Sequence, residues 1–381
     1  MLSTWCSQQQ QELTAAHPRG VDTFTGAVRA TARLAGPIAF LVYLAAQAAG
    51  HSGDLAAFAA AGSQVTHGDW TVFDTSYLQV GPLLLLLVGL GADAAEGVGL
   101  AQWFGASVVL AGLCAVLSHV LIRLLLADRA TGVRLAAASL GLTLSGSVAI
   151  SASYGHLEEW LVILLLTLAS AAAVRGRLLV PAALLAAAVT IKLWAVVGIV
   201  ILLVAASTRV IAMRVLVLCG LTAAAYLPFV LQSKVATFDM VWRVESPAPL
   251  SLALPNGHPF GYRARAVQVL VAVCTGALVI WVRRGRPDIV WALPLALVGS
   301  RLVLDPLPSP YYWAALVALL VLSSLTAAAC FVERALTASA LAVAGELILT
   351  TAQDRWGAVL LALLGATAVA VAARPRQPMQ A

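Results

Sequence analysis

Residues 195–206 read AVVGIVILLVAA, an unbroken apolar run. Similar runs recur along the chain, without the alternating polarity of a membrane β-barrel. The 381 residues are 61% hydrophobic and 10% charged, with a mean hydropathy of +0.93. A soluble protein is about half apolar and a quarter charged, so a soluble enzyme, a disordered chain, a coiled coil and a disulfide-stapled secreted domain are excluded. The composition predicts an all-α polytopic membrane protein.

The apolar runs give the candidate membrane segments, because a spanning helix needs about 20 mostly apolar residues. They are 34–50, 79–92, 99–122, 135–153, 160–174, 178–206, 215–231, 264–282, 289–304, 311–332, 335–352 and 356–373. Two lengths are unusual. The run 79–92 is short, which favours a short or re-entrant helix. The run 178–206 is too long for one span and too short for two, which favours a hairpin of half-helices that breaks near Lys192.

Clusters of arginine between these runs predict the orientation. The net charge of +6 comes largely from short basic clusters, which are typical of membrane topology signals rather than of nucleic-acid binding. Positive-inside bias places them in the cytoplasm of a plasma-membrane protein. We therefore expect one transmembrane domain at 34–373, cytoplasmic tails at 1–33 and 374–381, and outer loops at 51–78 and 232–262.

The first outer loop contains several acids. Asp54 begins a stretch, 54–65, whose small and apolar residues recur at helical spacing, so we expect an amphipathic helix in the membrane interface. Asp54 is then either a simple helix cap or a functional carboxylate. Asp69, Asp74 and Gln79 follow in the same loop.

A second polar cluster begins the run at 160–174. His156, Glu158 and Glu159 lie together in the sequence YGHLEEW. At helical spacing His156 and Glu159 share a face, whereas Glu158 points elsewhere. The pair is a weak metal-ligand signal, and acids in a first helical turn also fit an ordinary interfacial helix start.

Lys192 interrupts the apolar run in TIKLW. A charge at membrane depth is costly and is by default a functional hypothesis. Lys192 either pairs with a buried acid such as Glu159 or holds an anionic group such as a lipid phosphate, and we favour the second. Three further candidates lie near the outer ends of later helices: His258, Asp305 and Tyr311. Asp305 has Arg301 four residues before it as a possible partner, and Tyr311 also fits an aromatic belt.

These residues occur in an order that resembles a known family. The features are Gly53-Asp54, the spaced Phe58, Ala61-Gly62, Gly68 and Phe73, then 77–82, 155–159, 175–177 and 192–195. This order resembles the GT-C superfamily of integral membrane glycosyltransferases, most closely the actinobacterial mannosyltransferases that use polyprenyl-phosphate-mannose. The resemblance implies a GT-C-like bundle of about 11–13 transmembrane or half-membrane helices.

The resemblance also implies a reaction and roles for individual residues. A polyprenyl-phosphate-linked sugar donor enters from the membrane lipids, and a hydroxyl of a lipid or glycan acceptor attacks the sugar with inversion. Asp54 matches the general base. The candidates for binding the phosphate or the sugar of the donor are Lys192, His156, Glu158, Glu159 and Gln79. The acceptor or loop candidates are Asp69, Asp74, His258, Asp305 and Tyr311. A divalent cation is possible, since family members work with or without one.

The sequence departs from the family at two positions. Phe58 stands where many relatives have Tyr, and Leu55 stands where they have a second acid. Asp69 and Asp74 are therefore alternative bases. The rival functions are a transporter or lipid flippase, a non-catalytic scaffold, and a transferase for arabinofuranose or glucose.

Overall fold

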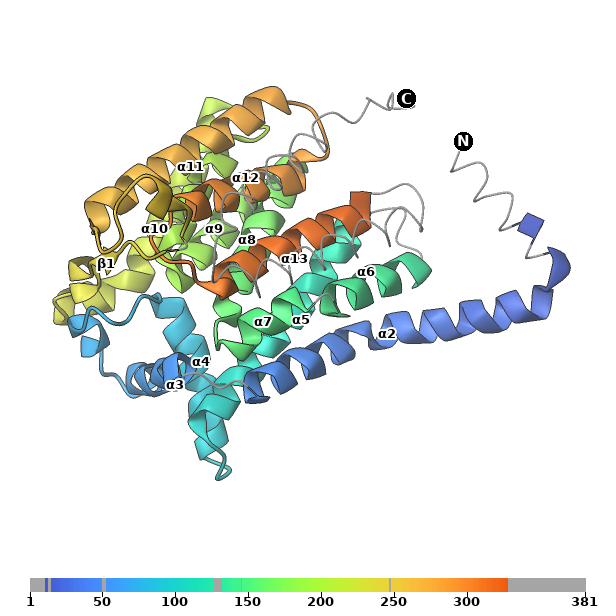
Figure 1. Cartoon of the computed structure of the whole chain (residues 1–381), viewed down its shortest axis with the longest axis horizontal. Coiled ribbons are helices and arrows are strands. Elements are labelled where there is room, and N and C mark those ends of the chain that lie inside the picture. Colours follow the sequence, from blue (N-terminus) through green and yellow to red (C-terminus); the bar gives the residue numbers. More distant parts are fainter. Residues whose placement is uncertain are drawn as a thin grey trace.

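The computed structural model describes residues 11–12, 15–49, 53–126, 132–144, 146–246 and 248–327. Figure 1 shows these residues folded into a bundle of helices. The helices are α2 (Pro18–Ala49), α3 (Gly53–Thr66), α4 (Pro82–Glu96), α5 (Gln102–Leu126), α6 (Gly132–Leu144), α7 (Ser147–Ser153), α8 (Leu157–Val174), α9 (Val180–Ile191), η3 (Leu193–Leu203), α10 (Thr208–Gln232), α11 (Tyr262–Val282), α12 (Ile289–Val303) and α13 (Pro310–Ala327). The loops contain η1 (Thr71–Asp74), η4 (Ala236–Asp239), η5 (Pro249–Leu252) and an antiparallel pair, β1 (Trp242–Arg243) and β2 (Pro259–Phe260).

The helices confirm the prediction of an all-α polytopic membrane protein. By length and composition, five of the described helices can cross a membrane: Ala30–Ala49 within α2, and α5, α8, α10 and α11. The bent pair α6 and α7 is a sixth candidate. Helix α2 begins at Pro18 and so extends into the predicted N-terminal tail. The predicted segments 335–352 and 356–373 and the tail 374–381 lie outside the described residues.

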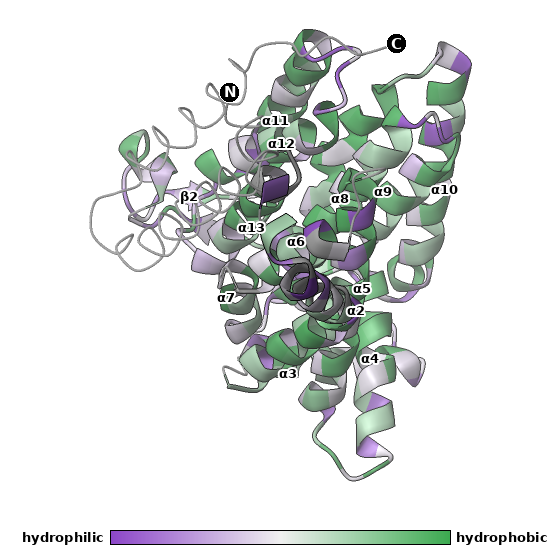
Figure 2. Ribbon diagram, turned by 90° about the vertical axis from the view of Figure 1, so that its right-hand side faces the viewer, coloured by the Kyte–Doolittle hydropathy of each residue, from purple (hydrophilic) through white to green (hydrophobic). Residues whose placement is uncertain are grey.

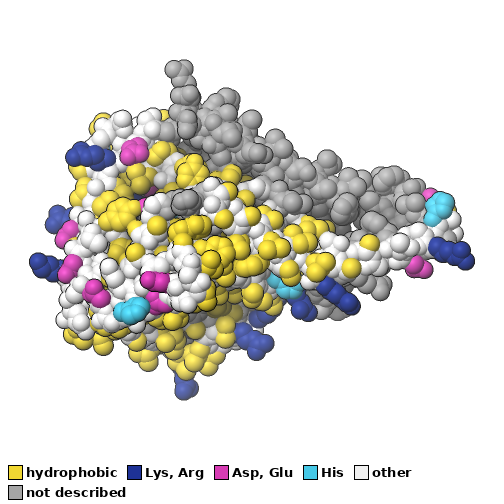
Figure 3. Space-filling model, turned by 90° about the horizontal axis from the view of Figure 1, so that it is seen from below, with side chains coloured by type: hydrophobic (Ala, Val, Ile, Leu, Met, Phe, Trp, Pro, Cys, Tyr) yellow, Lys and Arg dark blue, Asp and Glu magenta, His cyan; other side chains and the backbone are white. Residues whose placement is uncertain are grey.

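The core of the bundle surrounds α8. This helix is apolar on all sides, and nearly all of its residues are buried against α5, α9, α12 and α13. Helices α10 and α11 lie at the outside and expose apolar side chains such as Leu216 and Trp281. Hydrophobic residues dominate the helices in Figure 2, and Figure 3 shows a broad hydrophobic surface with most charged side chains at its margins. Such a surface suits contact with lipid.

The predicted hairpin of half-helices is present at 180–203. Helix α9 ends at Ile191, Lys192 is extended, and η3 then runs back as a 3₁₀ helix. At the other end of the hairpin, the buried guanidinium of Arg214 donates hydrogen bonds to four carbonyl oxygens, those of Arg177, Leu178, Leu202 and Val204. Arg214 thus closes the base of the hairpin, and Lys192 lies at its tip.

Close glycine contacts place α3 against α4. A Cβ atom on Gly89 would lie 2.2 Å from the carbonyl oxygen of Gly62, so only glycine permits this approach. Ser63 and Thr66 at the end of α3 also donate hydrogen bonds to Asp93 of α4. The predicted helix at 54–65 is confirmed, and it packs on α4 along much of its length. Helix α4 has 15 residues, which agrees with the short run predicted there.

The loops that were predicted to lie outside gather at one end of the bundle, which we call the loop end. Hydrogen bonds there join the first loop to the segment 233–237. The backbone N–H of Glu245 donates to the carbonyl oxygen of Pro306, and Arg265 of α11 donates to Asp305. At the opposite end, Arg175 donates a hydrogen bond to the carbonyl oxygen of Leu124, and Arg214 donates one to that of Arg177. This separation agrees with the predicted topology, and the direction in which the loop end faces stays a prediction.

Candidate functional site

Four segments bring charged side chains together at the loop end. Asp54 lies in the first turn of α3, and His156 immediately precedes α8. Glu158 and Glu159 lie in the first turn of α8, and Lys192 lies at the tip of the hairpin. Hydrogen bonds and ion pairs join these five residues, which we call the ion-pair chain.

Asp54 is the end of this chain that meets solvent, because its side chain is 40% exposed. Its Oδ2 lies 3.1 Å from Nε2 of His156, and the hydroxyl of Tyr77 donates a hydrogen bond to Oδ1. The hydrogen bond from His156 is the main cause that lowers the pKa of Asp54 to about 2, and the bond to Asp54 raises the pKa of Tyr77 to about 12. Asp54 is therefore an ionised carboxylate with two donors, beyond what a simple helix cap requires.

His156 lies between two carboxylates. Its Nδ1 is 2.6 Å from Oε1 of Glu158, while Nε2 faces Asp54. A neutral imidazole has only one N–H, so donation to both acids requires the imidazolium form. Burial alone would lower the pKa of His156, but the charge of Glu158 and the two hydrogen bonds outweigh burial and raise it to about 9. The ring stacks on Tyr311 with 4.0 Å between centroids.

The predicted pairing of His156 with Glu159 is wrong. It assumed that both residues belong to one helix, three positions apart. His156 instead precedes the helix, with φ −118° and ψ 44°, so its side chain does not follow the helical spacing. It turns to Glu158, the acid that helical spacing placed elsewhere.

Lys192 binds both glutamates. Its Nζ lies 2.9 Å from Oε1 of Glu158 and 2.5 Å from Oε1 of Glu159. The indole of Trp194 donates to the other oxygen of Glu159 at 3.1 Å. The ion pair with a buried acid, which was the less favoured interpretation of Lys192, is thus present. Lys192 also lines a cavity. Its binding of an anionic group, the favoured interpretation, stays a prediction.

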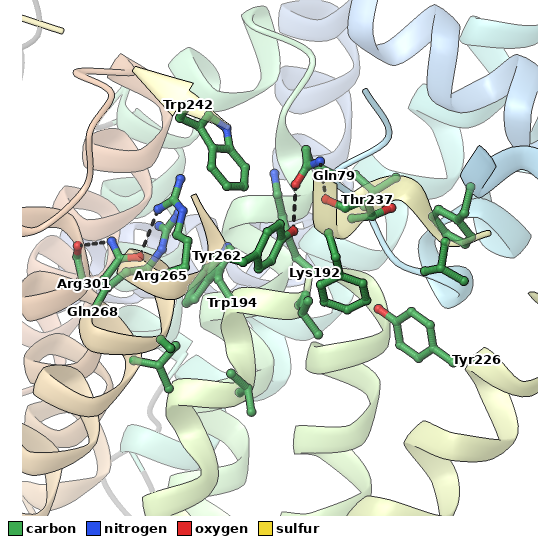
Figure 4. Close-up of a pocket in the computed structure, with 18 of the residues that line it drawn as sticks. Gln79, Lys192, Trp194, Tyr226, Thr237, Trp242, Tyr262, Arg265, Gln268 and Arg301 are labelled. Atoms are coloured by element: carbon green, nitrogen blue, oxygen red, sulfur yellow. Dashed lines mark hydrogen bonds between the residues drawn. The ribbon is translucent and has the colours of Figure 1, made fainter. Parts of the chain in front are cut away.

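The cavity has a volume of about 290 Å³ and lies between α10 and α11, which pack mainly against other elements rather than against each other. Figure 4 shows its wall, in which aromatic and aliphatic side chains predominate. Among the residues that the structure describes, its charged lining residues are Lys192, Arg265 and Arg301, and none of them is an acid. We call it the aromatic cavity.

Arg265 and Arg301 share one carboxylate. The predicted pair of Arg301 and Asp305 is present at 3.2 Å, and Arg265 reaches the same oxygen of Asp305 at 2.9 Å. The guanidinium of Arg301 lies over the rings of Trp194 and Tyr312, and its buried Nε has no hydrogen-bond partner among the described residues. Arg301 also lines the aromatic cavity. Sequence reasoning missed Arg265, although an arginine inside the predicted span 264–282 was a usable signal.

The remaining candidates fall into two groups. Gln79 lines the aromatic cavity, where the hydroxyl of Tyr262 donates to its Oε1 at 3.1 Å. Asp69 and Asp74, the alternative bases, act in the loops instead: Asp69 accepts from Thr71 within its own turn, and Asp74 accepts from residues 233 and 234. His258 is exposed beside β2, and its carbonyl pairs with residue 244.

The acids of this site are already paired with cationic side chains. Asp54 is paired with His156, and both glutamates are paired with Lys192. Among the described residues there is no group of three or more His, Cys, Asp or Glu placed to bind a metal ion.

No protein-family model, curated protein or solved structure matches this chain. Its function has to be inferred from these residues and their geometry.

Proposed function

We propose that the protein is a membrane glycosyltransferase that moves a sugar, with mannose as the first candidate, from a polyprenyl-phosphate donor to a hydroxyl of a lipid or glycan acceptor. One observation carries this proposal. An ionised, partly exposed carboxylate, Asp54, is joined through His156, Glu158 and Lys192 to a cavity with a mainly aromatic and apolar wall, in which every charged residue that the structure describes is a cation.

The aromatic cavity suits the donor. A sugar phosphodiester carries one negative charge and a long hydrocarbon chain, and both features have counterparts here. The wall of the cavity contains the cationic side chains of Lys192, Arg265 and Arg301. The positions of α10 and α11 at the outside of the bundle favour entry of the prenyl chain from the bilayer.

Asp54 is the proposed general base. The acceptor hydroxyl attacks the anomeric carbon and gives its proton to Asp54, while the bond from that carbon to the phosphate oxygen breaks with its electron pair. The products are an inverted glycoside and a prenyl phosphate. A carboxylate with a pKa of about 2 is a weak base, so we expect Asp54 to orient the hydroxyl and to accept the proton late.

For a protein of the plasma membrane, the positive-inside bias favours an orientation with the loop end outside the cell. The rival transporter or flippase requires polar groups through both halves of the membrane, whereas the ion-pair chain lies at the loop end.

The test is transfer of labelled sugar by the purified protein in nanodiscs. Polyprenyl-phosphate-mannose is the first donor, with the arabinofuranose and glucose donors in parallel. We expect Asp54→Asn to lower transfer by about 10²–10⁴-fold. Asp69→Asn is the matched control, because it changes an acid of the same loop that does not contact the ion-pair chain.

Three results would overturn parts of the proposal. Full activity in Asp54→Asn would remove Asp54 as the base. Movement of a lipid or solute across liposomes without sugar transfer would favour the transporter. Transfer only from another donor would change the sugar.

A further inference from the structure

One carboxylate oxygen connects the two halves of the site. Oε1 of Glu158 accepts a hydrogen bond from Nδ1 of His156 at 2.6 Å and one from Nζ of Lys192 at 2.9 Å. Glu158 is fully buried, and its other oxygen makes no hydrogen bond to any residue that the structure describes. Within the described part of the chain, the hydrogen bonds of this side chain are therefore made by the oxygen that joins His156 to the wall of the aromatic cavity.

The surroundings of His156 show why this oxygen matters. Two carboxylates face its ring, Asp54 from α3 and Glu158 from α8. Lys192 opposes them from the hairpin tip, Tyr311 of α13 stacks on the ring, and Tyr77 acts through Asp54. A buried imidazolium is stable only where acids outweigh desolvation and the opposing cation. Of the two acids, only Glu158 is fully buried, so its charge is the less screened by water.

We infer that Glu158 is a positioning residue, which keeps His156 protonated and directed at Asp54 and which ties that pair to Lys192 in the cavity wall. Glu158 does not touch the reacting atoms in this arrangement. It fixes the charge and the orientation of the group that holds the proposed base. Its catalytic meaning rests on the proposed function, but its effect on His156 does not.

Glu159 provides a matched control. It is adjacent in sequence, equally buried and also paired with Lys192, but its other partner is Trp194 rather than His156. Glu158→Gln and Glu159→Gln therefore remove the same charge next to the same lysine. Only the first removes an acid bonded to His156.

The experiment is a pH titration of His156 by NMR in nanodiscs, with ¹⁵N-labelled histidine and His156→Gln for assignment. In the wild type we expect both ring nitrogens to stay protonated at pH 8. In Glu158→Gln we expect the titration midpoint to fall by at least about one pH unit, and in Glu159→Gln by clearly less. An equal shift in the two variants, or none in Glu158→Gln, would refute the inference.

The wild-type titration and one further measurement, the alkaline limit of sugar transfer, keep the result decisive. If Glu158→Gln does not fold, a neutral His156 in the wild type at pH 8 would itself contradict the inference. The alkaline limit of sugar transfer, measured on the same samples, should move with the NMR midpoint. If the midpoint shifts as expected but the wild type transfers no sugar, the proposed function fails alone. If transfer occurs but the midpoint does not shift, the positioning role fails alone.

Discussion

Nε2 of His156 lies 3.1 Å from Oδ2 of Asp54, so a residue at the start of α8 completes a site that begins at the start of α3. The two residues are 102 positions apart in the chain. Their contact depends on the packing of α3 against α4 and α5, and of α5 against α8.

The pair of Asp54 and His156 predicts the pH range over which the two residues stabilise the folded protein. The raised pKa of His156 means that its stabilising contribution is complete below its ordinary value of 6.5 and is lost as the pH rises through about 9. The lowered pKa of Asp54 means that its contribution is complete above 3.8 and is lost as the pH falls through about 2. Thermal unfolding in detergent should show an alkaline loss of stability that His156→Gln reduces. An unchanged alkaline limb in that variant would contradict the pairing.

Tyr77 should tune Asp54 without replacing it. In Tyr77→Phe one donor to the carboxylate is lost, so we expect the pKa of Asp54 to rise and sugar transfer to fall by about tenfold, less than in Asp54→Asn. Tyr154→Phe is the control, since this exposed tyrosine contacts Tyr311 and not Asp54. Equal losses in both variants would show that the hydroxyl of Tyr77 has no specific role.

Arg265 should contribute to the binding of an anionic lipid. A lysine cannot keep its contacts with Gln268 and Asp305 while stacking on Trp242, so Arg265→Lys should weaken binding of farnesyl phosphate by about tenfold. Arg263→Lys is the control, because Arg263 is exposed on the same helix. Binding measured by calorimetry should be unchanged in the control, and equal affinities in the two variants would exclude Arg265 from the phosphate site.

The contact between Gly62 and Gly89 should be required for folding. A methyl group on Gly89 would meet the backbone of α3, so we expect Gly89→Ala to lower the free energy of unfolding by more than about 2 kcal/mol. Gly220→Ala changes a helical glycine with open space around it and should be neutral or slightly stabilising. Thermal denaturation followed by size-exclusion chromatography distinguishes the two, and a neutral Gly89→Ala would mean that α3 can shift without cost.

Arg214 should hold the hairpin. Arg214→Gln leaves buried carbonyl oxygens without donors, and we expect a loss of more than about 3 kcal/mol in the free energy of unfolding. Arg209→Gln, an exposed arginine on the same helix, should have little effect. If the two variants lose the same free energy of unfolding, α10 requires the positive charge at this end rather than the hydrogen bonds of Arg214.

The sequence predicted the features that follow from the lengths of apolar runs and from the helical spacing of residues. The length of the run 178–206 predicted a hairpin that breaks near Lys192, and the helix after Gly53 followed from its regular spacing. The partner of His156 could not be predicted, because it depends on two backbone angles before α8. Asp69 and Asp74 lie in a loop without periodicity, so only the fold separates them from Asp54.

The ion pairs around the site also have a long-range consequence. Four acids, Asp54, Glu158, Glu159 and Asp305, are matched by four cations, His156, Lys192, Arg265 and Arg301. A cluster without net charge has a field that fades within a short distance, so it cannot steer a charged molecule from the bulk. Capture of an anionic ligand then depends on direct contact inside a poorly screened interior, and its affinity should respond only weakly to ionic strength.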